Sequence, residues 1–423
     1  MRKTKKIVIH LGLFLLAMVT TTIAGMEHSK YPFTFFNYIN GAVHWNYSWD
    51  HVWNGLKYSV PFLLILTVHE FGHYFTAMYH KVKSSLPYYI PLWLPGIFAI
   101  GTMGAVIRLG KTRSTKQFFD IGVAGPLAGF IVALVVLWYG FTHLPPTQYL
   151  LEVNSQYEKV YQKYGEADFA NHLIENDKME LANMKRTVLD SLRREGWNED
   201  KIEAVSQQFG AHIYVFGTNL MFEFFKKYVA THPERVPDKY NLLHYPFLFA
   251  GYLALFFTAL NLMPIGQLDG GHILYGLIGQ KRFKIISPVI FTVFVVYAGL
   301  GMDYILPSKV DTIQELIINS ALYVGFLTII YRPVFNTFKS RLAIAMAIFS
   351  VQFFVGMFFP HIHGYAGFLF FALILSRLLG IYHPPAPHEH KLDTKRKVIG
   401  WVSLVIFVLC FSPQPFGSEF IQP

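Results

Sequence analysis

Long apolar stretches separated by short polar ones recur along almost the whole chain. A helix needs about 20 predominantly apolar residues to cross roughly 30 Å of hydrocarbon. Nine stretches approach that length, at residues 7–25, 58–80, 118–141, 246–264, 285–306, 316–331, 342–359, 365–382 and 398–412. The pattern therefore predicts an all-α polytopic membrane protein with about nine transmembrane helices.

One long segment, residues 142–245, does not follow this pattern. Between Glu152 and Glu203 lie 12 of the chain's 26 acidic residues. Apolar positions such as Leu181 and Val188 recur there with helical spacing. We expect a water-facing helical insertion on the outer side of the membrane. Its sequence leaves open whether it is a spacer, a lid or a domain that screens substrates.

Composition supports a membrane location and explains the charge. Apolar residues make up 53% of the chain and charged residues only 15%, where soluble proteins have about a quarter charged. The single cysteine, Cys410, excludes a disulfide framework and a cysteine-based zinc site. With the N-terminus inside, 20 basic residues fall in inner segments and three in short outer loops. This positive-inside distribution predicts a cytoplasmic N-terminus and accounts for the net charge of +10 without nucleic-acid binding.

The first stretch has a second interpretation. Four basic residues between Arg2 and Lys6 precede a short apolar segment and the small residues Ala24 and Gly25, which is also typical of a cleavable signal peptide. We favour a retained helix. Cleavage would leave the other predicted spans where they are.

The second apolar stretch contains the polar sequence His69-Glu70-Phe71-Gly72-His73. On a helix, His69 and His73 lie one turn apart on the same face, where both imidazoles can bind one zinc ion. Glu70 places a carboxylate beside that metal. It is positioned to take a proton from the attacking water and to pass it to a leaving amine.

The alternative is a polar helix face that neighbouring helices satisfy. A charged side chain at the centre of a bilayer costs about 2.5–3.5 kcal/mol, whereas structural zinc binding contributes about 10 kcal/mol or more in model peptides. Metal binding is therefore favoured. We expect one Zn2+ per chain.

A third protein ligand is expected from the segment that follows the span at 246–264. Pro264 and three glycines must break the helix there. Irregular backbone at membrane depth is tolerated only when it is buried in protein or lines a watery cavity. Asp269 would project from this break towards His69 and His73.

Together, the two segments resemble the paired signatures of the site-2 protease family of intramembrane zinc metalloproteases. The second signature reads Asn-x-x-Pro-x-x-x-Leu-Asp-Gly and begins at Asn261. The similarity extends over residues 55–141 and 245–275 and implies a three-helix catalytic core. It further implies that His69, His73 and Asp269 bind zinc, that Glu70 is the general base and acid, and that Asn261 holds the substrate backbone or the developing oxyanion.

Two further segments fit this family. Residues 100–108 resemble its membrane-dipping β-hairpin, whose exposed edge would pair with an unwound substrate helix; the alternative is a plain cytoplasmic loop. The resemblance assigns substrate contacts to Gly101, Thr102, Met103 and Gly104. Small residues at 119–129 predict close helix packing, and Asp120 is interpreted as an interfacial cap.

These interpretations divide the chain into five segments. Residues 1–54 hold the N-terminal transmembrane helix and an outer aromatic loop. Residues 55–141 and 246–275 form the two parts of the metalloprotease core, on either side of the insertion at 142–245. Residues 276–423 form a five-helix C-terminal membrane region, which we expect to act as a scaffold, a gate or a dimer surface in a homo-oligomer.

The sequence thus predicts a zinc metalloendopeptidase that cleaves transmembrane or membrane-adjacent segments of membrane proteins, as in regulated intramembrane proteolysis. Its expected partners are a transmembrane protein substrate and the lipid bilayer, and its expected location is the bacterial inner membrane. A membrane zincin that trims prenylated or exported peptides would draw its third ligand from a glutamate on another helix. A membrane zinc transporter or sensor would distribute polar residues over several spans and show a pseudo-repeat, whereas here they concentrate in two.

Overall fold

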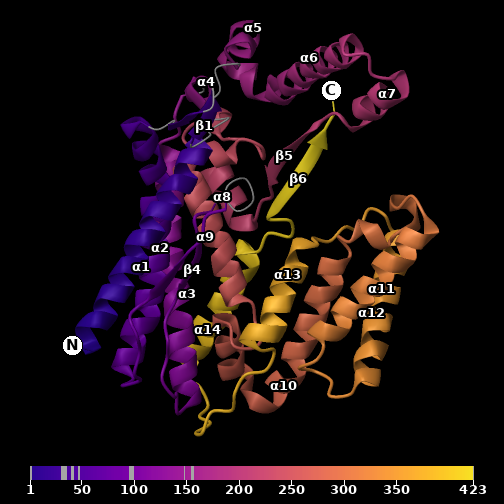
Figure 1. Ribbon diagram of the computed structural model, residues 1–423. Helices are drawn as coiled ribbons and strands as arrows, with labels where there is room; N and C mark the ends of the chain where they lie inside the picture. Colours follow the sequence, from indigo (N-terminus) through magenta and orange to yellow (C-terminus); the bar gives the residue numbers. More distant parts are fainter. Residues whose placement is uncertain are drawn as a thin grey trace.

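Each of the nine apolar stretches coincides with helical structure in the computed structural model (Figure 1). The structure describes residues 2–29, 36–39, 42–45, 48–94, 100–146, 148–153 and 157–422. The corresponding helices are α1 (Arg2–Ser29), α2 (Trp49–Tyr79), α3 (Thr115–Thr142), α9 (Pro246–Leu262), α10 (Asp269–Gly299), α11 (Ile313–Ile330), α12 (Phe338–Phe358), α13 (Gly367–Ile374, continued by a π-helical turn at Leu375–Leu379) and α14 (Thr394–Cys410).

Several of these helices have the length and composition of membrane spans. Within the described residues, five are long and apolar enough to cross a bilayer: α1, α3, α10, α11 and α12. Helix α9 and the run at residues 367–379 are apolar but shorter. The chain is therefore a mostly helical membrane protein. The count of nine crossings stays a prediction.

The N-terminal helices and α9 form one half of the molecule. Helices α1, α2 and α3 lie side by side, and α9 packs against α2 and α3 (Figure 1). The N-terminus lies at one end of these helices, whereas the C-terminus lies at the opposite end, beside the insertion.

Small residues bring the core helices into close contact, as expected where packing rather than water exclusion joins helices in lipid. A Cβ atom at Gly25 of α1 would lie 2.6 Å from the Gly55 carbonyl oxygen of α2. A Cβ atom at Gly251 of α9 would lie 2.5 Å from Leu137 of α3. Large side chains fill the remaining space, and the fully buried ones include Tyr58, Phe62, Phe141 and Tyr252.

The described residues of the insertion form five α-helices and one strand, besides three short 3-10 turns. They are α4 (Tyr149–Val153), α5 (Glu158–Asp168), α6 (Leu173–Arg194), α7 (Glu199–Gln208), β5 (Ala211–Phe216) and α8 (Leu220–Tyr228). Strand β5 pairs antiparallel with β6 (Phe416–Ile421), and Ala211 lies opposite Ile421. The insertion is therefore tied to the C-terminal end of the chain by backbone hydrogen bonds.

Three two-stranded sheets are present in the described part of the chain, so an all-α fold with a single hairpin is too narrow a description. The segment expected to form a hairpin, residues 100–108, supplies only its second strand, β4 (Thr102–Val106); the first strand, β3 (Tyr88–Pro91), precedes that segment, so the predicted bounds were wrong. The β5–β6 pair and the hairpin of β1 (Phe36–Ile39) with β2 (Ala42–Trp45) were not predicted. The rest of the expected outer aromatic loop, residues 30–35, 40–41 and 46–47, lies outside the described residues.

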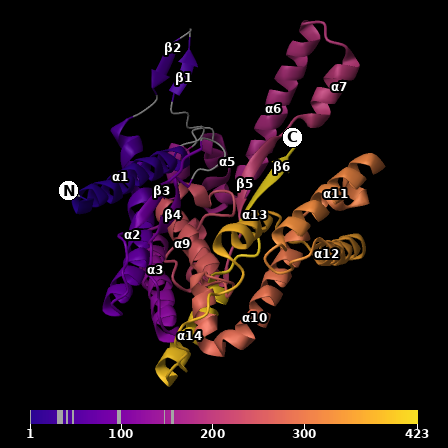
Figure 2. The same cartoon turned by 60° about the horizontal axis from the view of Figure 1, so that its bottom comes forward.

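The C-terminal region extends laterally from the core. Figure 2 shows α10 extending away from α9 and α14 towards a hairpin of α11 and α12. Helix α10 begins at Asp269 rather than near residue 285, and it is kinked at Gly279, where φ is +77°. Lys281, Arg282 and Lys284 interrupt the apolar pattern without ending the helix. The apolar stretch that begins at residue 285 therefore marks only the second part of α10.

Candidate metal centre

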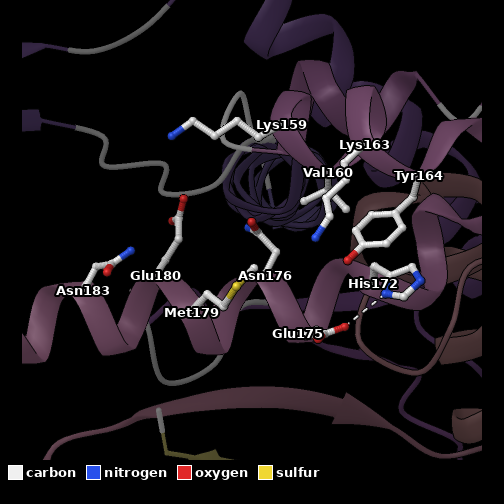
Figure 3. Close-up of a pocket in the computed structure, with 10 residues that line it drawn as sticks. All are labelled: Lys159, Val160, Lys163, Tyr164, His172, Glu175, Asn176, Met179, Glu180 and Asn183. Carbon is white, nitrogen blue, oxygen red and sulfur yellow. Dashed lines mark hydrogen bonds and ion pairs between the residues drawn. The ribbon is translucent and has the colours of Figure 1, made fainter.

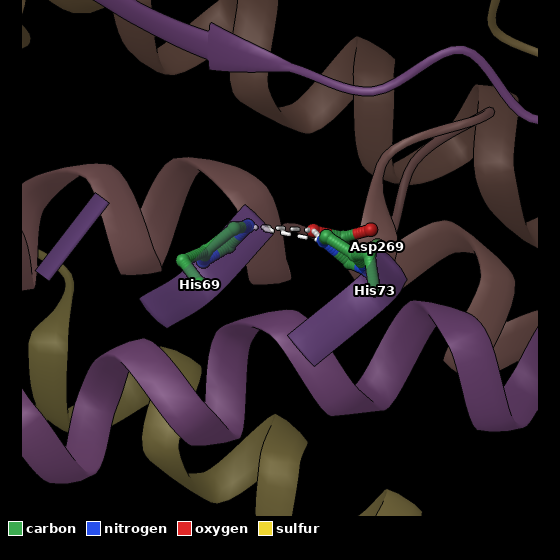
Figure 4. Close-up of side chains that lie close together, drawn as sticks. All are labelled: His69, His73 and Asp269. Carbon is green, nitrogen blue, oxygen red and sulfur yellow. Dashed lines mark hydrogen bonds and ion pairs between the residues drawn. The ribbon is translucent and has the colours of Figure 1, made fainter. Parts of the chain in front are cut away.

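Two histidines of α2 converge on one point in the core. His69 and His73 are both buried, and their Nε2 atoms lie 3.1 Å apart. Helix α2 carries them on successive turns of the same face, as the four-residue spacing requires. Figure 4 shows both imidazoles turned towards the same carboxylate.

That carboxylate belongs to Asp269, the first residue of α10. Its Oδ2 atom lies 3.6 Å from Nε2 of His69 and 3.3 Å from Nε2 of His73 (Figure 4). Helix α9 ends at Leu262, and the irregular residues 263–268 separate it from α10. The predicted break thus delivers Asp269 to α2 from a separate helix.

The spacing of the three donor atoms fits a zinc ion. Tetrahedral zinc bonds of about 2.0–2.2 Å to nitrogen and oxygen place the ligand atoms about 3.3–3.6 Å apart. The two histidine–aspartate distances, 3.3 and 3.6 Å, fall in this range, and the 3.1 Å between the two Nε2 atoms is slightly shorter. His69, His73 and Asp269 are the one such group found in the described residues, and all three ligand atoms lie within 4.8 Å of one another. Three protein ligands leave the fourth position of a tetrahedron for water or substrate.

The surroundings orient the His73 ring for this role. Its Nδ1 atom lies 2.7 Å from the Ile121 carbonyl oxygen of α3. Because that carbonyl accepts a hydrogen bond, Nδ1 carries the proton and Nε2 presents its lone pair to the metal position. The start of α3 thus fixes the tautomer of His73.

Glu70 lies beside this group. Its side chain is buried, with 7% exposed, and it interacts electrostatically with His73 and Asp269. Its carboxylate is also within reach of the Ile107 backbone amide, just beyond β4. A carboxylate in this position is able to exchange a proton with a water molecule at the metal position.

Glycines of α3 form the wall against which the two histidines rest. A Cβ atom at Gly125 would overlap the His73 imidazole, and one at Gly129 would lie 3.0 Å from Cβ of His69. Gly72 of α2 faces the same helix, because its added Cβ would lie 2.6 Å from the Ala124 carbonyl oxygen. The small residues of 119–129 therefore define the space that the ligands occupy, a role that the sequence analysis did not assign to them.

We expect Gly125→Ala to lower metal affinity by about 10- to 100-fold, the range seen when groups that orient a ligand are lost. The added methyl group must push the His73 ring away from the metal position. Competition with a chromophoric zinc chelator measures this change. Gly325→Ala in α11 is the matched control, because no atom lies within 4 Å of the added Cβ. Equal affinity in the two variants would contradict the placement of His73.

A segment from the far C-terminal region supports the break before Asp269. The Gly266 amide donates to Oγ of Ser287 at 3.0 Å, and that hydroxyl donates to the Ile381 carbonyl at 2.7 Å. Nδ1 of His272, one turn beyond Asp269, lies 2.7 Å from Nε2 of His383. Burial lowers the pKa of His383 to about 3, so this ring is neutral at physiological pH. The residues after α13 thus hold the start of α10 in place.

The remaining predicted site residues occupy two positions. Asn261 lies half-buried in the last turn of α9, and no contact found among the described residues joins it to the three ligands. Gly101, Thr102, Met103 and Gly104 lie at the start of β4 and just before it, where Thr102 Oγ1 donates to the Ile90 carbonyl at 2.8 Å.

The hairpin of β3 and β4 lies next to α2. Tyr89 of β3 shares a hydrogen bond of 2.7 Å with Thr67, two residues before His69. Met103 is 48% exposed, and a Cβ atom added at Gly104 would meet no other atom within 4 Å. The β4 strand therefore offers accessible backbone close to Glu70.

Asp120 lies away from the three ligands and joins elements at one end of the core. Its carboxylate lies 2.8 Å from Nε2 of His80 and accepts two hydrogen bonds from Arg396, at 2.7 and 2.8 Å. These contacts connect the end of α2 and the start of α3 to α14. Asp120 thus joins helices through its side chain, whereas Ser114 caps the start of α3, so the structure does not show Asp120 as a helix cap.

Comparison with known proteins gives one family and several plant relatives. The model of peptidase family M50 matches residues 57–302, more than half of the chain. "Probable zinc metalloprotease EGY1, chloroplastic" of Oryza sativa subsp. japonica is 27% identical over 228 residues, which is 54% of this chain and 29% of the relative. The Arabidopsis thaliana protein of the same name is 28% identical over 230 residues, 53% of this chain and 30% of the relative.

A shorter match has higher identity. "Probable zinc metalloprotease EGY2, chloroplastic" of Oryza sativa subsp. indica is 37% identical over 84 residues, 20% of this chain and 14% of the relative. The chain thus spans less than a third of the length of these relatives. No solved structure gives a significant match.

Proposed function

The chain belongs to peptidase family M50, and on that premise we propose that it is a zinc-dependent endopeptidase that hydrolyses peptide bonds within or beside the membrane. The observation that carries this proposal is the convergence of His69, His73 and Asp269, with Glu70 beside them, among apolar helices. His69, His73 and Asp269 would hold the metal ion.

The chemistry follows from the residues around that position. A bound zinc ion polarises a peptide carbonyl and lowers the pKa of water. Glu70 accepts a proton from the attacking water at its carboxylate and then donates it to the nitrogen of the leaving amine. Both transfers need a carboxylate beside the metal position. The side chain of Glu70, next to His73 and Asp269, supplies it.

The substrate class is inferred from where this site lies. Because the surrounding helices are apolar, we propose that the substrate is a transmembrane or membrane-adjacent segment of another membrane protein. Helical peptide bonds are shielded by their own hydrogen bonds, so the segment must become extended before cleavage. The exposed β4 backbone near Gly104 would pair with the extended segment, and Asn261 would hold its backbone or the developing oxyanion.

The cellular setting and assembly are part of the same proposal. The matched relatives are named as chloroplast proteins. The excess of basic residues in the loops on one side gives an orientation but does not identify the membrane. We propose a bacterial plasma membrane, regulated intramembrane proteolysis as the process, and the lateral α11–α12 hairpin as a surface for homo-oligomer formation. Cross-linking of the chain in its native membrane tests the last point.

Metal removal tests the proposed activity directly. We expect the purified chain in lipid vesicles to cleave a co-reconstituted transmembrane peptide, to stop after treatment with 1,10-phenanthroline, and to recover with stoichiometric zinc. Mass spectrometry of the products identifies the cleaved bond. Cleavage that persists after complete removal of metal would contradict the proposal.

The same vesicles separate a protease from a zinc transporter. A fluorescent zinc indicator inside the vesicles reports any flux across the bilayer. We expect peptide cleavage without zinc accumulation. Zinc flux without cleavage would favour the transporter, the alternative function that the sequence left open.

A further inference from the structure

Helix α8, the last α-helix of the insertion, packs against the core by one of its sides. The buried residues of that side are Phe222 and Phe225, whose ring centres lie 5.1 and 5.9 Å from that of Phe141 in the last turn of α3. The Phe222 ring also lies 5.8 Å from that of Tyr252 in α9, and α8 contacts α14. One side of α8 is thus fixed to core helices at the end of the core that faces the insertion (Figure 1).

A second side of α8 is apolar but uncovered. Leu220, Phe224 and Tyr228 follow one another at intervals of four residues, which places them on one face of the helix. Their exposed fractions are 59, 52 and 67%. Because a row of three large apolar side chains is unfavourable in water, this face needs an apolar environment.

The third side of α8 is charged. Lys226 and Lys227 are exposed in the last turn and belong to none of the ion pairs found among the described residues. Glu223 lies on the same side, and the Thr218 hydroxyl donates a hydrogen bond to it at 2.7 Å. The ammonium group of Lys227 lies 5.2 Å from the centre of the Tyr228 ring, at the boundary with the apolar face. Two ammonium groups and one carboxylate leave this side positively charged.

The charged helices earlier in the insertion present a different surface. Between α5 and α6 lies a cavity of about 220 Å³, lined by charged residues that include Lys159, Glu175 and Glu180 (Figure 3). A helix between a core and water needs one apolar and one polar side. The additional apolar side of α8 therefore indicates a third medium beside the helix.

That medium is identified by the level at which α8 lies. Trp138 and Tyr139, near the end of α3, are 54% and 41% exposed, and Trp and Tyr side chains are enriched at membrane–water interfaces. The Thr231 amide, three residues after α8, donates to the Phe141 carbonyl at 3.3 Å. Helix α8 thus ends beside the last turn of α3, at the surface of the bilayer that the core helices cross.

The lengths of the neighbouring helices agree with this level. Helices α9 and α14 each contain 17 residues, which is about 25 Å of helix, whereas the hydrocarbon layer is about 30 Å thick. Helix α8 contacts both of them. Its exposed apolar face therefore extends the apolar surface that these short helices leave incomplete.

The two exposed sides of α8 match the surface of a phospholipid leaflet. Phosphate groups lie directly above the acyl chains there, so an apolar face beside a basic one meets complementary groups on both. A second copy of this chain fits less well, because a symmetric contact brings the same lysines together and their charges repel.

We propose that α8 is an interfacial helix that binds acidic phospholipids in the leaflet on the side of the insertion. Leu220, Phe224 and Tyr228 lie among the upper acyl carbons, and Lys226 and Lys227 contact the phosphate groups. The insertion, which its sequence predicts to face water, is thereby anchored to the membrane at its last helix. The site shares no residue with the metal centre, so this inference does not depend on the proposed peptidase activity.

Site-directed spin labelling of the full chain measures the depth of α8. A nitroxide is attached to Phe224→Cys, or to the control Lys201→Cys at an exposed position of α7, and the buried Cys410 is replaced by serine in both. The vesicles contain phosphatidylcholine and phosphatidylglycerol. Collision rates are measured with oxygen, which concentrates in hydrocarbon, and with a water-soluble nickel complex. We expect the label at position 224 about 5–10 Å below the phosphate groups and the label at position 201 in water.

Two results of this experiment would overturn the proposal. Equal access of the nickel complex to positions 224 and 201 would place α8 in water. Shielding of position 224 from both reagents would show that protein, and not lipid, covers the face. Phe224 is exposed, so its replacement leaves the packed side of α8 intact.

The two lysines are tested by counting bound lipids. Native mass spectrometry of the purified chain in detergent with added phosphatidylglycerol should show at least one fewer bound lipid per chain when Lys226→Ala and Lys227→Ala are combined. The matched control combines Lys159→Ala with Lys201→Ala, which removes two exposed lysines of α5 and α7, and should bind as many lipids as the wild type. An unchanged count in the α8 variant, or an equal loss in the control, would contradict the assigned headgroup contact.

Discussion

Replacement of Glu70 by glutamine is expected to slow peptide cleavage by about 10²- to 10⁴-fold, the usual contribution of a positioned acid–base group. Glutamine keeps the size of the side chain but cannot accept a proton from water. The three ligand atoms belong to other residues, so the variant should keep its metal. Cleavage of a reconstituted transmembrane peptide and elemental analysis of the same preparation measure both quantities.

A matched carboxylate separates this effect from a general loss of charge. Glu315 lies exposed at the start of α11, and Glu315→Gln should cleave at the wild-type rate. If Glu70→Gln cleaves within tenfold of wild type, Glu70 is not the acid–base residue. If it loses its metal as well as its activity, the carboxylate acts as a ligand instead.

Removal of the Asp269 carboxylate is expected to reduce zinc affinity by at least about 100-fold, because loss of a group that merely orients a ligand already costs 10- to 100-fold. Asp269 is the one ligand that does not come from α2, and without it two imidazoles of one helix face remain. Asp269→Ala should therefore also lose cleavage. A chelator competition experiment on the purified variant gives the affinity.

The control for this variant is Asp303→Ala, which removes an exposed carboxylate beyond the end of α10. It should bind zinc like the wild type. Retention of tight zinc binding in Asp269→Ala would mean that another group completes the site, and the assignment of the second sequence signature would then be wrong.

The sequence was informative where local chemistry decides local structure. The glycines and Pro264 end α9 at the expected place, and the break leads directly into Asp269. The four-residue spacing of His69 and His73 fixes their common helix face whatever surrounds them. The nine helical stretches follow from hydropathy alone, because their composition satisfies the requirement of the bilayer.

Contacts between distant segments could not be predicted in this way. Strand β5 pairs with β6 across some two hundred residues of chain, and neither strand carries a pattern that names its partner. The hydrogen bond between His272 and His383 likewise joins segments that are far apart in the sequence. Both depend on how the C-terminal region folds back against the core.

The glycines of α3 show a second limit to prediction from the sequence. Their spacing predicts close helix packing, but it does not identify which residues pack against them. The structure places Gly125 against His73 and Gly129 against His69. The glycines that allow close helix packing thus also shape the candidate site. Only the position of α3 relative to α2 reveals this second role.

The central claim is that His69, His73 and Asp269 together bind one zinc ion. X-ray absorption spectroscopy at the zinc edge of the purified chain tests it most directly. We expect one zinc per chain with two imidazole nitrogens and one carboxylate oxygen at about 2.0–2.2 Å, and an altered oxygen contribution in Asp269→Ala. A spectrum without imidazole scattering, or one that Asp269→Ala leaves unchanged, would contradict it.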